Sequence, residues 1–295
     1  MSLAEPMTFP ERAHPATPEP SAATGRRLPR LTQARAPLTC EVAVTNEFGV
    51  AGTVSIPAER DLTVYVDKRE LVTLMTLGGH PEWLVLGYLL NQRLVASVDD
   101  IESITVDWDV GAASVKTRHG IHRIEDRTAH KVVTTGCGQG SVFGHLMDDV
   151  DSIRLPPDAV LRQSSLYDIV NTIRLRDTTY KVAGSVHACA LFVGGELQFF
   201  VEDVGRHNAV DTIAGWMSMQ DRLPDGEKVF YTTGRLTSEM VIKSAQMGVP
   251  VVISRSGITQ MGLEVAQRVG LCAIGRATHK RFLCYSHAQR IVFDA

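Results

Sequence analysis

The sequence predicts an α/β fold preceded by a smaller α+β region. In the second half of the chain, apolar strands alternate with amphipathic helices, which is typical of a sheet whose strands are joined by helical crossovers. In the first half, short segments alternate apolar and polar residues, which is typical of strands with one buried face. The chain has 295 residues, 44% hydrophobic and 21% charged, and so can bury a large core without disulfides or structural metal.

The first half divides into a tail and a small domain. Residues 1–37 are rich in Pro, Ala, Thr and Arg and have no hydrophobic period, so we predict a disordered tail there. We predict a small α+β domain over 38–135. Its first strands are predicted over CEVAVTNEFGV and LTVYVDKREL, in a sheet with one buried face. A helix follows over HPEWLVLGYLLNQRLV, with Pro81 in the first turn, and strands return over ESITVDWDV and ASVKTRHG.

Residues 136–295 are predicted to form the α/β domain. ACALFVGGELQFFVE predicts a hairpin that turns at Gly194–Gly195. Helices are predicted over HNAVDTIAGWMS, over LTSEMVIKSAQMG ending at Gly248, and over TQMGLEVAQRVG. They alternate with strands over KVFYTTG, VPVVISRS and LCAIGR. This order predicts a mostly parallel, buried sheet.

Composition excludes several functional classes. The formal net charge of -3 is too small to indicate a nucleic-acid binder. No apolar run approaches the roughly 20 residues of a membrane span, and the first residues lack the apolar core of a secretory signal. The five cysteines are scattered, with no CxxC and no zinc-ligand spacing. We therefore expect a cytoplasmic protein with free thiols, no membrane or nucleic-acid partner and no structural metal.

Cys137 lies in the glycine-rich segment VVTTGCGQGSVFGH. Glycines leave the sulfur little covered, and backbone amides in such a turn favour the thiolate, which is the form that accepts or donates sulfur. Cysteine is also among the most buried residue types, so an inert thiol in a tight turn is the alternative interpretation. The residues alone leave both interpretations open.

Three further segments concentrate polar side chains where a strand meets a turn. EDVGRHN (202–208) could hold an acid–base pair of His and carboxylate, or a loop in which Asp203 caps and Arg206 pairs with a carboxylate. TTGRLTSEM (232–240) could hold an anion at a helix start, or only an N-cap at Thr237 or Thr233. GRATHKRF (275–282) could bind phosphate, or could be a solvated basic loop.

A zinc deaminase is disfavoured by the residues around His187. These enzymes use H-x-E followed by P-C-x-x-C. Here Cys189 stands at the position of the Glu, and P-C-x-x-C does not occur. His187 is therefore interpreted as a packed or hydrogen-bonding histidine.

Taken together, these segments resemble one family, the formate dehydrogenase accessory proteins or FdhD sulfurtransferases. The resemblance runs in order from about Glu41 to the end of the chain. It is carried by GYLLNQRLV, TTGCGQG, GSVHACALF, VEDVGRHNAVD, TTGRLTSEMVIKSAQMGVPVVISRS and GRATHKRFLCYSHAQRI. The EDVGRHNAVD and TGRLTSEMVIKSA blocks are the most specific of these.

The resemblance implies a fold and a function. The fold would be a cytidine-deaminase-like three-layer sandwich without the zinc. The function would be a relay in which a cysteine desulfurase loads persulfide sulfur onto Cys137. That sulfur would pass to a bound Mo-bis(molybdopterin guanine dinucleotide), which is cargo for the catalytic subunit of formate dehydrogenase. The resemblance also implies a homodimer.

Three positions, in two segments, depart from the family pattern. The family's CGxCG loop has a second cysteine where this chain has Gly140, so a disulfide within the loop is excluded. The family's cofactor contact, an aromatic-x-Arg-Gly stretch, aligns with a basic stretch in which Arg276 and His279 replace the aromatic residue and the glycine. The residues predicted to bind the cofactor are Arg276, Ala277, Thr278, His279, Lys280 and Arg281. Because of the missing cysteine, a non-catalytic chaperone that binds the cofactor for a molybdoenzyme is the alternative function.

Overall fold

A computed structural model describes residues 26–121, 133–134 and 150–294 of the chain. Cys137 and the predicted domain boundary at 135/136 lie outside the described residues. In the part that the structure describes, no helix is long and apolar enough to span a membrane.

The first half contains a six-stranded sheet in the order β1-β6-β7-β4-β5-β8. Its strands are β1 (Arg30–Leu31), β4 (Arg60–Val66), β5 (Arg69–Thr76), β6 (Ile101–Asp107), β7 (Ala112–Thr117) and β8 (Val133–Thr134). Helix α1 (Pro81–Asn91) covers one face of this sheet, and its Leu84, Leu86 and Leu89 are fully buried in the core. The short helix η1 (Val98–Asp100) precedes β6. The predicted helix with Pro81 in its first turn is therefore confirmed.

The prediction of a disordered tail is wrong for residues 26–37. Strand β1 pairs in parallel with β6, with Arg30 opposite Ser103. The Arg26 guanidinium donates hydrogen bonds to the carbonyls of Ser218 and Gln220 at 2.7 and 2.8 Å. These contacts join residues far apart in sequence, so the local composition of the segment could not reveal them.

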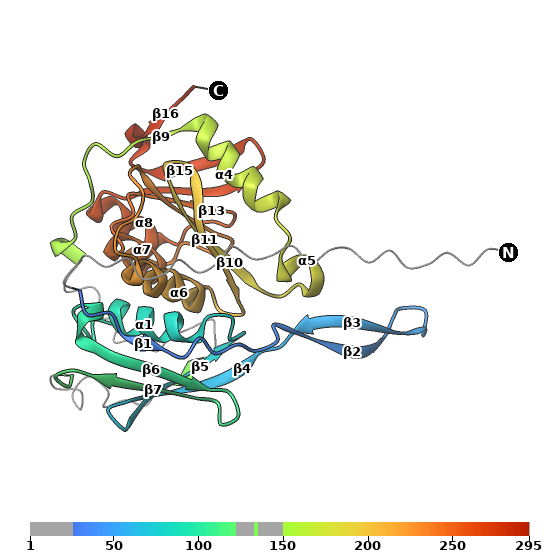
Figure 1. The fold of residues 1–295 in the computed structure, drawn as a ribbon. Helices are drawn as coiled ribbons and strands as arrows, with labels where there is room; N and C mark the ends of the chain where they lie inside the picture. Colours follow the sequence, from blue (N-terminus) through green and yellow to red (C-terminus); the bar gives the residue numbers. More distant parts are fainter. Residues whose placement is uncertain (1–25, 122–132, 135–149, 295) are drawn as a thin grey trace.

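A two-stranded arm projects from the body of the molecule (Figure 1). It consists of β2 (Thr39–Thr45) and β3 (Ala51–Pro57), which pair only with each other among the described strands. Its apolar side chains are exposed: Leu38, Val44, Phe48, Val50, Val54 and Ile56. The prediction that this segment lies in a half-buried sheet is therefore wrong. Alternating apolar residues identify a strand, but not the surface that covers it.

The second half contains another six-stranded sheet, in the order β11-β10-β12-β13-β14-β15. Its strands are β10 (His187–Val193), β11 (Glu196–Asp203), β12 (Lys228–Thr232), β13 (Val251–Ser254), β14 (Cys272–Thr278) and β15 (Arg281–Ser286). The hairpin turn at Gly194–Gly195 is confirmed, since both glycines have positive φ. β12, β13 and β14 pair in parallel, whereas β10 and β15 are antiparallel to their neighbours. The sheet is therefore mixed, and the prediction of a mostly parallel sheet is wrong.

Helices cover both faces of this sheet. On one face lie α6 (Arg206–Met219), α7 (Ser238–Gln246) and α8 (Gln260–Val269). On the other lies α4 (Gln163–Leu175), which the sequence analysis did not predict. The remaining short elements are η2 (Val150–Ser152), β9 (Leu161–Arg162), α5 (Thr179–Ala183), η3 (Ala288–Arg290) and β16 (Ile291–Val292). The result is a three-layer α/β/α arrangement (Figure 1).

The two halves meet through α1 and α6, which pack closely against each other. Helix α1 therefore lies between the first sheet and the helices of the second half (Figure 1). The ends of β11, β12, β13 and β14 all point to one side of the molecule. Because the carboxyl ends of parallel strands commonly hold ligand sites, this side is where a site is expected.

Candidate functional site

A cavity of about 590 Å³ opens beyond the carboxyl ends of β12, β13 and β14, on the face of the sheet covered by α4. Its polar lining comes from α4, α5, β10, β11, β14 and the loops beside the strands: Arg174, Thr178, Lys181, His187, Glu202, Thr233, Arg255, Ser256, Thr278 and His279. Its apolar lining includes Tyr180, Phe200 and Tyr231. A cavity of this size with a few convergent polar groups is typical of a small-molecule site.

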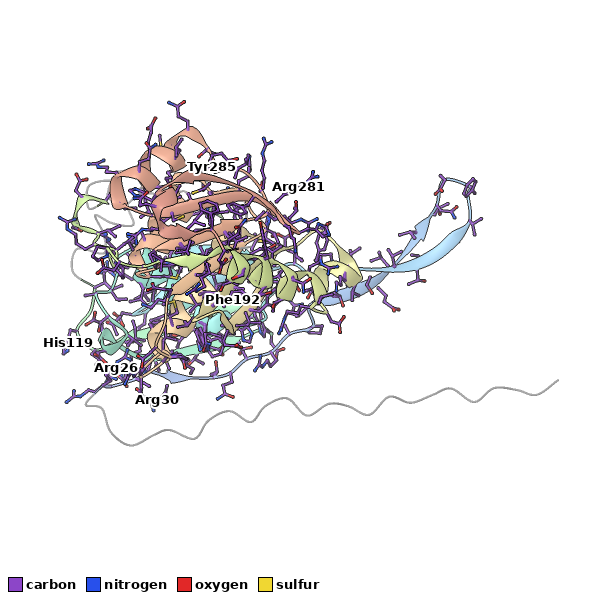
Figure 2. The ribbon with its side chains drawn as sticks, turned by 90° about the horizontal axis from the view of Figure 1, so that it is seen from above. Arg26, Arg30, His119, Phe192, Arg281 and Tyr285 are labelled. Atoms are coloured by element: carbon purple, nitrogen blue, oxygen red, sulfur yellow. The ribbon has the colours of Figure 1, made fainter. Side chains whose placement is uncertain are left out.

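The predicted cofactor-binding stretch forms the tip of the β14–β15 hairpin. Ala277, Thr278 and His279 line the cavity. The Nζ atom of Lys280 lies 6.0 Å from the centre of the Tyr167 ring. Arg281 lies on the side of the body from which the arm projects (Figure 2). The cavity lining thus takes in three of the six predicted residues, and does not include Arg276, Lys280 or Arg281.

The backbone of this hairpin explains one departure from the family pattern. His279 has φ +52°, which is the left-handed region that favours glycine. The resemblance places a glycine at this position. The backbone of this chain therefore has the conformation that glycine favours, although the residue here is a histidine. Arg276 also has φ +52°, and its amide donates a 2.6 Å hydrogen bond to the Ser256 carbonyl. That bond fixes the hairpin against the loop after β13.

Basic side chains outnumber acidic ones around the cavity. Arg174, Lys181 and Arg255 contribute positive charge. The carboxylate in the lining, Glu202, accepts hydrogen bonds from the amides of Thr179 and Tyr180 at the start of α5, at 2.5 and 3.2 Å. Its charge is therefore partly compensated by the helix terminus. Together with the aromatic rings, this lining suits an anionic ligand that carries a flat ring system.

Asp203, at the end of β11, ties the start of α6 to the first half of the chain. Its carboxylate accepts hydrogen bonds from Thr76 Oγ1 at 2.5 Å and from the Leu77 amide at 3.2 Å. It also accepts from the Gly205 amide at 3.0 Å and from Asn208 Nδ2 at 2.9 Å. Burial raises the pKa of Asp203, although these hydrogen bonds act in the opposite direction. Of the two interpretations of EDVGRHN, the geometry supports a structural role for Asp203.

His207, in the same EDVGRHN segment, lies in a different environment. It is 3% exposed, and neither ring nitrogen has a hydrogen-bond partner among the described residues. Its Nε2 lies 3.5 Å from Glu239 Oε2 of α7. Burial lowers the pKa of His207 to about 3, and the charges of Lys243 and Arg206 act in the same direction. His207 is therefore neutral near pH 7, and the EDVGRHN and TTGRLTSEM segments meet here.

Arg206 crosses from α6 to the turn after β12. A side chain at Gly234 would come within 2.8 Å of the Cδ atom of Arg206, so glycine leaves the space that this side chain fills. Burial lowers the pKa of His187, and the nearby charges of Arg206 and Arg235 lower it further. Thr237 is the N-cap of α7, as one interpretation predicted, but its side chain makes no capping hydrogen bond.

Several residues that line the cavity are not among the predicted site residues. His187, interpreted from the sequence as a packed or hydrogen-bonding histidine, lines the cavity. Arg255 and Ser256 follow the predicted strand VPVVISRS, and polar residues directly after a buried strand could have indicated them. Arg174 and Lys181 belong to helices that were not predicted. Within the described residues, no group of three or more His, Cys, Asp or Glu side chains could hold a metal ion.

Comparisons with known proteins agree on one family. The model of the FdhD/NarQ family matches residues 57–292. A protein named sulfur carrier protein FdhD from Bacillus pumilus is 29% identical over 245 residues, covering 81% of this chain and 91% of the relative. One of the same name from Saccharolobus solfataricus is 29% identical over 232 residues, covering 78% and 86%.

The solved structures give the same fold. A crystal structure of a protein described as a formate dehydrogenase accessory protein from Desulfotalea psychrophila superimposes with a TM-score of 0.69. The match is 24% identical and covers 87% of this chain and all of that one. The α/β architecture is therefore shared along most of the chain.

Proposed function

The chain belongs to the FdhD/NarQ family, and from this premise we propose that it is a sulfur carrier that acts as a sulfurtransferase. It accepts persulfide sulfur from a cysteine desulfurase and passes it to a bis-guanylated molybdenum cofactor destined for formate dehydrogenase. The names of its relatives support the sulfur-carrier role. The observation that supports this cofactor as the cargo is the basic cavity, whose wall includes Ala277, Thr278 and His279.

The cavity holds one guanine nucleotide end of the cargo. Its aromatic lining, Phe200 and Tyr231, offers ring faces for a base. Arg255 and Lys181 offer charge-assisted hydrogen bonds to phosphate oxygens. The three-layer arrangement around the cavity also supports the expected likeness to the cytidine deaminase sandwich. The sequence lacks the H-x-E and P-C-x-x-C motifs that bind zinc in the deaminases.

Cys137 is the sulfur carrier, and the chain before it supports this role. β8 ends at Thr134, three residues before Cys137, and pairs with β5 at Leu74. Two residues beyond Leu74, Thr76 contacts Asp203 at the start of α6. β8 therefore runs toward the side of the molecule on which α6 begins, and Cys137 follows it three positions later in the sequence.

The transfer to Cys137 needs one nucleophile. Its thiolate attacks the outer sulfur of the desulfurase persulfide, the S–S bond of the desulfurase breaks, and the desulfurase cysteine leaves as a thiolate. The product is a persulfide on Cys137. Gly140 provides no second thiol, so the sulfur cannot be released by a disulfide within the loop.

Intact-protein mass spectrometry after incubation with a desulfurase and cysteine tests this role. The protein should gain one sulfur atom, reversibly with reductant, and Cys137→Ala should gain none. Cys40→Ala is the matched control, because Cys40 is the exposed cysteine on the arm, and it should behave like the unmodified protein. If the protein gains no sulfur from a desulfurase that is active on another acceptor, the non-covalent chaperone replaces the proposal.

Arg255→Ala tests the nucleotide site. Loss of a charge-assisted hydrogen bond costs about 1.5–3 kcal/mol, so the affinity for guanosine diphosphate should fall at least about tenfold by titration calorimetry. Arg222→Ala is the control, since its guanidinium pairs with Asp225 2.7 Å away in the exposed loop after α6. Equal affinities of Arg255→Ala and the unmodified protein would remove Arg255 from the site.

The arm supports the proposal that the protein is a homodimer. A hairpin of two strands is marginally stable by itself, and this one exposes Phe48 and Val50 at 79% and 60%. A second copy would cover these side chains. Analytical ultracentrifugation of Phe48→Asp should show a shift from dimer to monomer. Val292→Asp, a substitution on β16, should leave the dimer intact. A monomeric unmodified protein at micromolar concentration would contradict the dimer.

The protein is proposed to act in the cytoplasm. The described cysteines Cys40, Cys189, Cys272 and Cys284 are free thiols. Free thiols and a persulfide carrier both require a reducing compartment, which supports this location.

A further inference from the structure

Two thiols outside the sulfur-transfer chemistry lie in contact on β14 and β15. The Sγ atom of Cys272 is 3.8 Å from the Sγ atom of Cys284. Cys272 is fully buried, and Cys284 is half-buried on β15, the edge strand of the sheet. Cys189 has a different environment, because its thiol donates to Thr232 Oγ1. The contact therefore pairs one accessible thiol with one protected thiol.

Their surroundings give the two thiols different reactivity. The hydrogen bond between them lowers the pKa of Cys284 and raises that of Cys272, whose burial raises it further. Cys284 is thus both the more exposed thiol and the one that ionises first. Since the thiolate is the reactive form, an oxidant attacks Cys284, and Cys272 is placed to attack the oxidised sulfur.

We propose that Cys284 and Cys272 are a redox-active dithiol that hydrogen peroxide converts into a disulfide. The Cys284 thiolate attacks one peroxide oxygen, the O–O bond breaks, and sulfenic acid and hydroxide form. The Cys272 sulfur then attacks the sulfenic sulfur. The S–S bond forms, the S–O bond breaks, and the sulfenic hydroxyl leaves as water with the Cys272 proton. In sum, two thiols lose two electrons and two protons, and peroxide becomes two waters.

The strand register shows what this disulfide requires of the sheet. Cys284 lies opposite Ile274, so Cys272, two residues earlier on β14, is its diagonal neighbour. Diagonal neighbours are separated by about 7–8 Å, whereas Cα atoms joined by a disulfide are usually about 4.4–6.8 Å apart. Closing the bond therefore pulls β15 along β14. The ladder already shifts register between Ala273 and Ile274, where such a movement can be absorbed.

The movement reaches the cavity because the same two strands end in its wall. Thr278 pairs with Arg281 across the tip of the hairpin, and Thr278 and His279 line the cavity. The disulfide displaces these two residues and weakens nucleotide binding. This consequence rests on the proposed function, whereas the disulfide itself does not. A bond that requires strand movement is strained, and strained disulfides are the readily reduced ones, so the change is reversible.

Peptide mapping tests the disulfide. The full-length protein is treated with hydrogen peroxide, alkylated and digested with trypsin. Cleavage after Arg268, Arg276, Arg281 and Arg290 separates VGLCAIGR from FLCYSHAQR. Oxidation should join these two peptides, and dithiothreitol should part them. Cys284→Ser and Cys272→Ser should lose the product, and Cys40→Ser should keep it. Sulfinic acid on Cys284 with Cys272 still alkylated would overturn the proposal.

Titration with guanosine diphosphate tests the consequence. Cys137→Ala serves as the background, so that peroxide chemistry at the carrier does not contribute. Oxidation should lower the affinity about tenfold, as expected for one or two lost hydrogen bonds, and reduction should restore it. In Cys284→Ser the affinity should not respond to peroxide. An unchanged affinity in protein that carries the disulfide would overturn the coupling. If the reduced protein does not bind guanosine diphosphate, the nucleotide site is contradicted. The peptide map would still show whether Cys272 and Cys284 form a disulfide.

Discussion

Replacing Gly87 by alanine is expected to abolish stable folding of the protein, because α1 and α6 cross at this residue with their backbones in contact. A Cβ atom at Gly87 would overlap the carbonyl oxygen of Asp211 and approach the Gly215 nitrogen to 2.7 Å. At Gly215, a Cβ atom would overlap the carbonyl oxygen of Trp83. The obstacle on each side is backbone, which cannot rotate out of the way.

The cost of this substitution should exceed that of ordinary overpacking. An extra methylene in a core costs about 1–3 kcal/mol when side chains can adjust. Here both helices must separate, and each buries apolar residues of its own core, such as Leu86 on α1 and Ile213 on α6. We therefore expect Gly87→Ala to lower the free energy of unfolding by more than about 3 kcal/mol, or to yield no soluble protein.

Urea unfolding followed by circular dichroism measures this effect. Gly257→Ala is the matched control, because a Cβ atom there meets nothing within 4 Å and its φ is not in the left-handed region. The control should stay within about 0.5 kcal/mol of the unmodified protein. A Gly87→Ala protein with the unfolding midpoint of the control would show that the helices cross less tightly than the structure indicates.

This crossing illustrates what the sequence could not reveal about the fold. Periodicity located α1 and its first-turn Pro81, because each helix carries its own apolar stripe. Gly87 within that helix gives no local sign of its partner Gly215, which lies 128 positions later in the chain. Strand positions were likewise predictable, whereas their neighbours were not. The antiparallel pairing of β10 with β12, for example, joins Cys189 to Thr232, and the exposure of the arm depends on which other segments of the chain cover it.

The candidate site shows the same division. The stretch 276–281 was predicted from family resemblance, and the cavity wall contains part of it. His187, Glu202 and Arg255 reach the same cavity from β10, β11 and the loop after β13. Only the order of strands in the sheet brings them together. The left-handed backbone at His279 is also set by the turn between β14 and β15, since a histidine by itself does not indicate that conformation.

The second large effect concerns charges buried between α6 and α7. Lys243 is completely buried, and its Nζ lies 2.9 Å from Asp211 Oδ2 and 3.2 Å from Glu239 Oε1. Asp211 is also completely buried, and it accepts a 2.7 Å hydrogen bond from Asn91 of α1. Burial by itself would lower the pKa of Lys243, but attraction to the two carboxylates outweighs it and raises that pKa. The ammonium group is therefore charged, and it compensates the completely buried carboxylate of Asp211 as well as that of Glu239.

Lys243→Met should lower the free energy of unfolding by about 3–5 kcal/mol, because it keeps the apolar stem of the side chain and leaves Asp211 as an uncompensated buried charge. Lys116→Met is the matched control. Lys116 is 64% exposed and lies 2.8 Å from Glu102, and exposed pairs contribute at most about 1 kcal/mol. In an Asp211→Asn background, Lys243→Met should lower the free energy of unfolding by at least about 1 kcal/mol less, because no charged Asp211 is then left without its partner. Equal costs in the two backgrounds would show that Lys243 stabilises the protein through packing rather than by compensating Asp211.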